Sequence, residues 1–337
     1  MLPIINSLAA TAGQAQAKSK WGGWLLGVGI WFLPLLWTDF TTYLVLTIAG
    51  VTMGMLLFVT ASGFTVILGL MDVINLAHGA VFAWGGYLGF SIMQGFAGWI
   101  GEAGLGGSLG AMLLALAAAG AVGWVLGVLM EWIIIRRTYG SHLKQILITM
   151  GTSLVMIQLI IIVWGPNNEV MPVPGAFRGS IDLGNVIIER FRILCLVVGG
   201  LLFTALYFLL QKTKLGIIVR AGVENREVVQ TLGHNIRKIF THVFAAGAAL
   251  AAVGGAMWAV YSREIMPGMG DENLIFALIV VVVGGMGSVT GCFLASIMVG
   301  LAFNYVAYSV PSLALGVNIM IMAVVLMLKP SGLLGRE

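Results

Sequence analysis

Long apolar runs separated by short polar segments make up most of the chain. A helix that crosses the hydrocarbon core of a membrane needs about 20 mostly apolar residues. Such runs cover residues 21–37, 43–61, 76–97, 107–135, 143–164, 193–211, 239–262, 274–286, 288–309 and 313–328. The pattern predicts an all-α fold, a polytopic transmembrane helical bundle of about 8–10 spans, with all ten runs as the upper count.

Two of these runs have unusual lengths. The run 107–135 is long enough to tilt in the membrane or to project from it. The run 274–286 is too short to cross alone at about 1.5 Å per residue. It ends in Gly284-Gly285-Met286-Gly287-Ser288, which predicts one half of a broken or re-entrant helix.

The composition supports this class and excludes others. Of the 337 residues, 60% are hydrophobic and 9% are charged, against about 25% charged residues in soluble domains. These values exclude a cytosolic globular enzyme, a disordered chain, a disulfide scaffold and a nucleic-acid-binding protein. The 47 glycines suit close packing of helices in lipid, and we interpret the two cysteines as small packing residues.

The distribution of basic residues predicts the topology. If the amino terminus is cytoplasmic and the spans alternate, 13 of the 17 Lys and Arg residues are cytoplasmic. The four external ones are Arg178, Arg190, Arg192 and Arg263. This asymmetry follows the positive-inside rule and predicts that both termini are cytoplasmic. Residues 1–20 are then a cytoplasmic leader, with a cleaved signal as the alternative, and 21–337 form a single transmembrane domain.

Two connections are longer than the rest. The external loop 165–192 begins Gly165-Pro166-Asn167-Asn168, and the alternation over 180–183 predicts a small hairpin. The cytoplasmic loop 211–238 has apolar residues at helical spacing and a break at Gly233. It predicts two short helices along the membrane face, joined near Ala221-Gly222. They serve either to dock a cytoplasmic partner or, as an ordinary basic connector, to contact anionic lipid.

Polar residues interrupt the apolar pattern between 69 and 79. Intramembrane Asp and His are costly, and they usually face a cavity or a partner. Asn75 and His78 are three residues apart and would share a helix face, with Asp72 one turn earlier. We predict a broken helix in which Asp72, Asn75, His78 and Gly79 line a translocation path for a polar solute. Alternatively, Asp72 lies at the membrane edge, Asn75 caps a re-entrant helix and His78 only joins two helices.

Several motifs of soluble chemistry are missing from the sequence. There is no G-x-x-x-x-G-K-[ST] sequence for nucleotide phosphates. No Ser/His/Asp set for nucleophilic catalysis and no metal-ligand spacing occur either. We therefore expect no ATP site, no metal and no cofactor on this chain.

Four segments together resemble the branched-chain amino acid permease family of ABC transporters. Residues 69–79, GLMDVINLAHG, are similar to its G-x-x-x-x-I-N-x-A-H-G hallmark, and residues 284–291, GGMGSVTG, to its G-G-x-G-S-x-x-G segment. The tail 328–335 reads LKPSGLLG, similar to the usual ending of the family. The loop 220–235 resembles the coupling motif of such permeases, with departures at Asn225 and Val229.

This resemblance covers the chain from about residue 43 to its end, and it implies partners. The chain would be the permease subunit of an importer in the bacterial inner membrane, among membrane lipid. It would pair with a homologous second permease, two cytoplasmic ATPase subunits that bind ATP and Mg, and an external solute-binding protein that touches the 165–192 loop. The residues implied in coupling to the ATPase are Arg220, Glu224, Asn225, Arg226, Leu232 and Gly233.

The resemblance leaves the solute open. The family covers leucine, isoleucine and valine, and also urea, short amides and small aromatic or carboxylic acids. The alternative hypothesis is a stand-alone secondary transporter or channel for a small polar solute such as urea. It would explain broken helices and Asp72, but it leaves the long 211–238 loop without a role.

Overall fold

A computed structural model of the chain describes residues 29–335 apart from Trp37, Leu183, Asn185, Asn225, Leu232 and His234. The predicted leader, 1–20, lies outside the described residues. The elements are η1 Leu33–Leu36, α2 Phe40–Met71, α3 His78–Gly95, α4 Ala97–Ile100, α5 Leu105–Ile133, η2 Ile135–Arg137, α6 His142–Trp164, β1 Glu169–Val170, η3 Gly175–Phe177, β2 Ser180–Asp182, β3 Ile187–Glu189, α7 Arg190–Lys212, α8 Lys214–Glu224, α9 Arg226–Thr231, α10 Ile236–Ser262, β4 Glu264–Ile265, α11 Met269–Gly284, α12 Val289–Ser309, η4 Pro311–Leu313 and α13 Ala314–Leu328.

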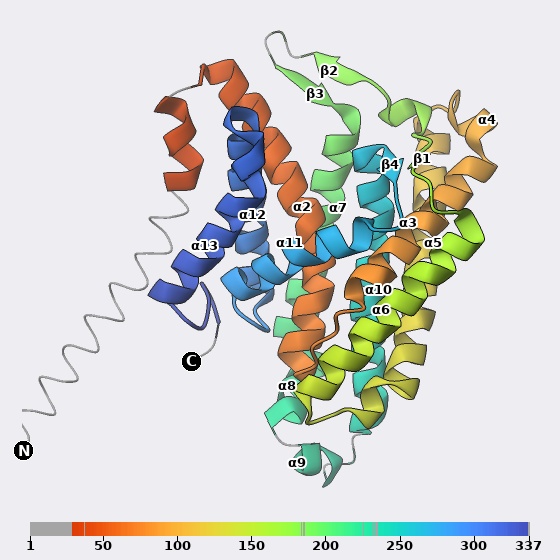
Figure 1. Cartoon of the computed structure of the whole chain (residues 1–337), viewed down its shortest axis with the longest axis vertical. Helices are drawn as coiled ribbons and strands as arrows, with labels where there is room; N and C mark the ends of the chain where they lie inside the picture. The colour runs from red at the N-terminus through yellow and green to blue at the C-terminus, as the bar shows by residue number, and fades with distance from the viewer. Residues whose placement is uncertain are drawn as a thin grey trace, which may run out of the picture.

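The predicted polytopic all-α fold is confirmed. Within the described part of the chain, seven helical stretches are long and apolar enough to cross a membrane, and they are built on α2, α5, α6, α7, α10, α12 and α13. The shorter helices α3 and α11 lie among them, as Figure 1 shows. The short helices α8 and α9 lie at one end of the bundle, and the short strands lie at the other.

The helix α2 is longer than the predicted span 43–61. It begins after Asp39, whose carboxylate accepts hydrogen bonds from the Thr42 amide and hydroxyl at 3.0 and 2.8 Å. These bonds lower the pKa of Asp39. The helix continues to Met71 and ends where Asp72 adopts a left-handed conformation with φ 54°. The apolar run 64–71 keeps α2 buried along this extension. The predicted end of the span at residue 61 was therefore too early.

The inner helices pack so closely that their backbones are in contact. α10 lies against α2, α3 and α5, and α2 lies against α12. At Gly255 of α10, a Cβ atom would collide with the Phe82 carbonyl oxygen of α3. Only glycine permits this approach, because the opposing atom belongs to a backbone and cannot rotate away.

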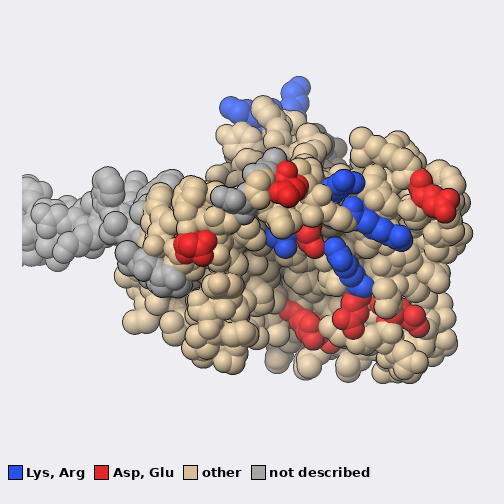
Figure 2. Space-filling model, turned by 90° about the horizontal axis from the view of Figure 1, so that it is seen from above, with Lys and Arg blue, Asp and Glu red and all other residues tan. Residues whose placement is uncertain are grey.

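The strands tie the external loop to the bundle. β2 and β3 form the predicted antiparallel hairpin, with Ile181 opposite Ile188. The pairing of β1 with β4 was not predicted, and it joins the loop to the turn between α10 and α11. Arg263 in that turn donates to Glu189 at 3.0 Å. Figure 2 shows basic and acidic side chains interspersed over this end of the molecule.

The 211–238 loop does contain two short helices, but the predicted joint was wrong. α8 continues through Ala221 and Gly222 to Glu224, and α9 begins at Arg226. Gly222 lies against α10, where a Cβ atom would collide with the Ile236 side chain. The glycine therefore serves close packing of two helices and does not interrupt one.

Candidate functional site

The polar segment 72–77 leaves α2 and returns toward the middle of the bundle. The predicted common helix face of Asp72, Asn75 and His78 is wrong, because the chain between Met71 and His78 is not helical. Figure 1 shows this segment rising from the end of α2 to the start of α3. The His78 Nε2 lies 3.1 Å from the Thr60 carbonyl oxygen. Thr60 precedes Met71 by eleven residues, or about 16 Å of helix, so α3 begins deep within the bundle.

Side chains of α6 satisfy the backbone groups that the break releases. The Ile74 amide donates to Gln145 Oε1 and the Leu76 amide donates to Thr149 Oγ1, both at 3.1 Å. Within the segment, the Ala77 amide donates to Asn75 Oδ1 at 3.1 Å. Unpaired backbone groups are costly inside a membrane. Gln145 and Thr149 were not among the predicted site residues, although two polar residues four apart in an apolar run were a usable signal.

The starts of α3 and α11 meet at two glycines. A Cβ atom on Gly79 would lie 2.5 Å from the Gly270 carbonyl oxygen. Both helices direct their amino-terminal ends here, and such ends carry partial positive charge. Asn75, His78 and Asn273 are buried beside these ends. Among the described residues, three of their atoms lack a hydrogen-bond partner: Asn75 Nδ2, His78 Nδ1 and Asn273 Oδ1.

These three atoms have complementary chemistry. The contact with the Thr60 carbonyl places the His78 proton on Nε2, because a carbonyl oxygen only accepts. His78 Nδ1 is then an acceptor, as is Asn273 Oδ1, while Asn75 Nδ2 is a donor. The starts of α3 and α11 thus offer a hydrogen-bond donor and two hydrogen-bond acceptors, in addition to the partial positive charge of the helix ends.

Asp72 lies apart from this buried group. Its side chain is 74% exposed, and its Oδ2 lies 3.6 Å from His142 Nε2 at the start of α6. The structure therefore brings Asn75, His78 and Gly79 together and leaves Asp72 at the exposed end of α2. This position agrees with the alternative interpretation of Asp72 as an edge residue.

The predicted half-helix ends in a turn that holds the carboxyl-terminal tail. α11 begins five residues before the predicted run and ends at Gly284. Gly285 and Gly287 both have positive φ, and the Ser288 hydroxyl accepts the Gly291 amide at the start of α12. The amides of Leu333 and Leu334 donate to the last carbonyls of α11 at 2.8 and 3.1 Å. Two motifs that lie about forty residues apart in the sequence, 284–291 and 328–335, are therefore in contact.

The helix α8 contacts two inner helices. Val219 of α8 is buried against Val66 and Leu70 of α2, and Gly222 lies against Ile236 of α10. Gly233 has φ +83°, as the predicted left-handed break requires, and its amide donates to the Gln230 carbonyl at 2.9 Å. No neighbouring atom would touch a Cβ there.

The remaining coupling residues stay predictions. Asn225 and Leu232 lie outside the described residues, and so do the side chains of Arg220, Glu224 and Arg226. The structure therefore gives no distances for their predicted contacts with an ATPase.

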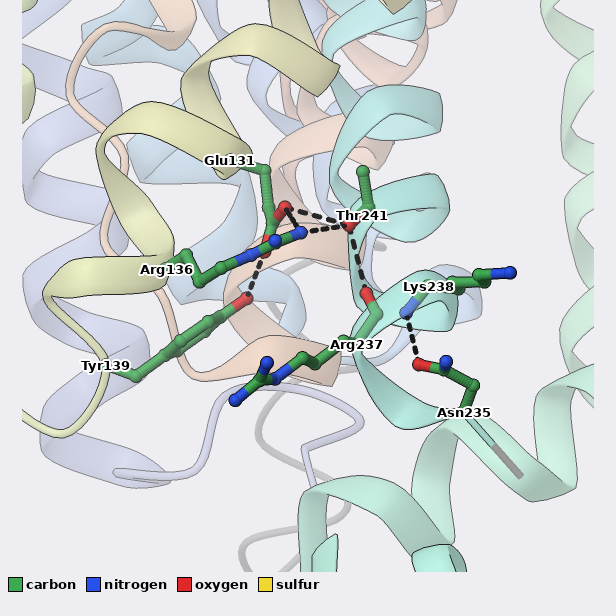
Figure 3. Close-up of polar contacts among 7 residues, drawn as sticks. All are labelled: Glu131, Arg136, Tyr139, Asn235, Arg237, Lys238 and Thr241. Carbon is green, nitrogen blue, oxygen red and sulfur yellow. Dashed lines mark hydrogen bonds and ion pairs between the residues drawn. The ribbon is translucent and has the colours of Figure 1, made fainter. Parts of the chain in front are cut away.

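A buried acid joins α5 to α10 beside these helices. The Glu131 side chain is 1% exposed and accepts from Arg136 Nη2 at 2.9 Å. It also accepts from the hydroxyls of Thr241 and Tyr139, at 2.8 and 3.5 Å (Figure 3). The sequence analysis gave Glu131 no role, although a single acid before Arg136-Arg137 in an apolar run is a usable signal.

The profile of a known family matches most of the chain. It is described as branched-chain amino acid transport system / permease component, and it covers residues 46–327. The chain belongs to this permease family. The family's members are transport subunits, and a multi-pass membrane protein agrees with the seven apolar helices.

Named relatives align over nearly their whole length. The high-affinity branched-chain amino acid transport system permease protein BraD of Pseudomonas aeruginosa is 30% identical over 303 residues, covering 87% of this permease and 96% of BraD. The corresponding LivH protein of Escherichia coli K12 is 28% identical over 300 residues, covering 85% and 94%. A probable LivH of Methanocaldococcus jannaschii is 29% identical over 162 residues, covering 46% and 49%. No solved structure matches the chain significantly.

Proposed function

We propose that this permease forms the translocation path of an ABC importer for branched-chain amino acids or a related small polar solute. The family match over residues 46–327 carries the proposal. The relatives BraD and LivH are named as permeases of high-affinity branched-chain amino acid transport systems. The stand-alone transporter is not favoured, because these relatives are subunits of larger transport systems.

The partners follow from this assignment. The importer contains a homologous second permease, two cytoplasmic ATPases that bind ATP and Mg, and an external solute-binding protein. It lies in the inner membrane of a bacterium, with both termini of this chain in the cytoplasm. The positive-inside pattern of the loops supports this orientation.

The path runs between the starts of α3 and α11. A branched-chain amino acid carries a carboxylate and an ammonium group. The positive helix ends and Asn75 Nδ2 suit the carboxylate, and the acceptors on His78 and Asn273 suit the ammonium group. Gly79 and Gly270 close the path where they touch. The solute passes when α3 and α11 move apart.

The coupling helices transmit ATPase movement to this gate. α8 packs against α2 at Val219 and against α10 at Gly222. α2 carries the Thr60 carbonyl that holds His78, and α10 packs along α3. A displacement of α8 therefore reaches the start of α3 through two rigid helices.

Uptake by cells tests the assignment. Deletion of the gene should abolish ATP-dependent uptake of at least one radiolabelled solute among leucine, isoleucine, valine and urea, and re-expression should restore it. Inactivation of the partner ATPases should have the same effect as deletion. Continued uptake without the ATPases would contradict the importer and favour a stand-alone transporter.

Gly233 tests the coupling role with a matched pair of variants. Gly233→Val forces a β-branched residue into the left-handed region at a cost of about 1–2 kcal/mol. Gly233→Asn keeps that conformation, because Asn tolerates it. The valine variant should lose ATPase co-purification or coupled uptake, and the asparagine variant should keep both. Equal behaviour of the two variants would show that the turn has no part in coupling.

The external hairpin tests the contact with the solute-binding protein. Ile181 and Ile187 are exposed on β2 and β3. Ile181→Lys together with Ile187→Lys should reduce binding-protein-dependent uptake without loss of subunit assembly. Glu102→Lys, at the same end but before α5, should leave uptake unchanged. Normal uptake in the hairpin variant would refute the contact.

A further inference from the structure

An open pocket lies where α9 leads into α10, at the α8–α9 end of the bundle. It has a volume of about 560 Å³. Its lining comes from the end of α5 and the first two turns of α10: Arg136, Asn235, Arg237, Lys238, Thr241 and His242. Asn235, Arg237 and Lys238 lie at the end of the 211–238 loop, but neither the translocation path nor the contacts of α8 described above use any residue of the lining.

Among the described residues, the pocket lining has more positive charge than the buried acid behind it can neutralise. Glu131 is buried behind it and pairs with Arg136. Within the described part of the chain, Arg237 and Lys238 form no ion pair. Figure 3 shows Arg237 extending beneath Arg136 and Tyr139, while Lys238 extends from the opposite side of the start of α10.

The location of Arg237 and Lys238 at the start of α10 concentrates positive charge there. Asn235 is the N-cap of α10, so Arg237 and Lys238 lie in its first turn. The dipole of a helix favours acids at this end, and cations there add to its positive charge. An anion in the pocket would offset both contributions.

Exposed apolar side chains of α5 lie beside the pocket. The ring of His242 stacks on Trp124, with centroids 5.7 Å apart. Trp124, Leu129 and Trp132 are exposed on α5. Tryptophan is common where a membrane-spanning helix meets the polar interface. A ligand that fills the pocket and also covers this surface has an anionic head and apolar chains.

We propose that the pocket binds the phosphate-bearing headgroup of an anionic phospholipid, whose acyl chains lie along α5. The phosphodiester lies at the start of α10, with Arg237 on one side of the pocket and Lys238 on the other. A free phosphate compound would satisfy the charge but would leave the apolar surface of α5 uncovered.

Lipid retention tests this site on the full chain. The protein is purified from nanodiscs of phosphatidylcholine with increasing fractions of phosphatidylglycerol, and bound lipids are measured by native mass spectrometry. Arg237→Gln with Lys238→Gln should weaken phosphatidylglycerol retention about 30-fold, from about 1 kcal/mol per basic residue. The control Arg137→Gln with Lys144→Gln removes the same charge at the same end outside the pocket, and it should retain the lipid as wild type does. Arg237→Lys should also retain it, which separates charge from misfolding.

Three outcomes would overturn the proposal. The first is equal retention by the pocket variant and the control. The second is displacement of the lipid by glycerol 3-phosphate or inorganic phosphate at equal phosphate concentration, which would assign the pocket to a soluble phosphate compound. The third is loss of the bound lipid in the assembled transporter, which would assign the pocket to acidic groups of the ATPase.

A spectroscopic measurement locates the lipid independently. Phosphatidylglycerol with brominated acyl chains should quench tryptophan fluorescence more strongly than brominated phosphatidylcholine. Trp124→Phe with Trp132→Phe should remove this difference. A difference that persists in this variant would place the lipid elsewhere and refute the site.

Discussion

The inner helix α10 and the outer helix α7 are both apolar enough to cross a membrane, but their surroundings are opposite. In its most apolar 18-residue stretch, α10 has 67% of its residues buried inside the protein, whereas α7 has 11%. α2 and α12 resemble α10, and α6 and α13 resemble α7. Apolar content places a helix in the membrane, but it does not distinguish the interior of the protein from its exposed shell, because both are apolar.

The surroundings of the glycines distinguish the inner helices from the outer helices more clearly than apolar content does. Gly255 of α10 touches the backbone of α3, and a Cβ atom has no room there. Gly151 of α6 has no neighbouring atom that a Cβ would touch. The inner helices therefore depend on backbone contact with one another, whereas α6 makes no such contact at Gly151.

The largest expected effect comes from adding one methyl group to the inner layer. Gly255→Ala should destabilise the protein by about 3 kcal/mol, because the new Cβ collides with a carbonyl oxygen. Thermal unfolding in detergent, followed by size-exclusion chromatography, measures it. Gly151→Ala is the matched change in an outer helix and should be neutral or slightly stabilising. Equal effects would remove the distinction between the two layers.

Next comes the buried acid between α5 and α10. Glu131→Leu removes the carboxylate that neutralises Arg136 and accepts from Thr241, and it should reduce stability by about 2 kcal/mol. This value is below that for a fully buried pair because Arg136 is one-third exposed. Glu131→Gln keeps an acceptor and should lose less in the same unfolding assay. A leucine variant as stable as wild type would show that the network contributes no stability.

A smaller effect is expected where an outer helix supports the inner break. Gln145→Leu leaves the Ile74 amide unpaired and should cost about 1–2 kcal/mol. Hydrogen exchange of residues 72–77 should become faster. Gln145→Glu retains an acceptor at this position and serves as the control. Unchanged exchange in the leucine variant would mean that α6 does not hold the segment.

The smallest effect concerns the exposed start of α2. Asp39→Ala removes an N-cap, so the first turn should fray and stability should fall slightly. The folded-state pKa of Asp39 lies below its ordinary value of 3.8. Its contribution is therefore present above that value and is lost as the pH falls through the folded-state pKa. Unfolding at several pH values should show wild type and variant converge in acid; a constant difference would contradict this role.

Element positions were predictable where the signal was local. The runs 143–164 and 288–309 agree with α6 and α12 to within one residue at each end. The hairpin at 180–189 and the left-handed Gly233 were also correct. Each depends on the residue itself or on near neighbours in the sequence.

The errors occurred where distant segments decide the structure. A break in the helix was predicted for 69–79, but the shared face of Asp72, Asn75 and His78 was wrong. Gln145 and Thr149 of α6 accept amides of the segment 72–77 and stabilise it in an open conformation. Gly222 resembled a break, yet the proximity of α10 makes it a packing residue within α8. Glu131 gained its role only when Thr241, 110 residues later, came within 2.8 Å.

The sequence by itself determined the membrane class, the helical runs, the distribution of charge and the family motifs. These are sums or short patterns, and transfer into lipid depends on them residue by residue. Only the tertiary structure decided which helices form the interior, which polar atoms are left without partners, and that α3 and α11 begin against each other. Those outcomes depend on contacts between backbones, which apolar content does not encode, because lipid and protein interior are equally apolar surroundings for a side chain.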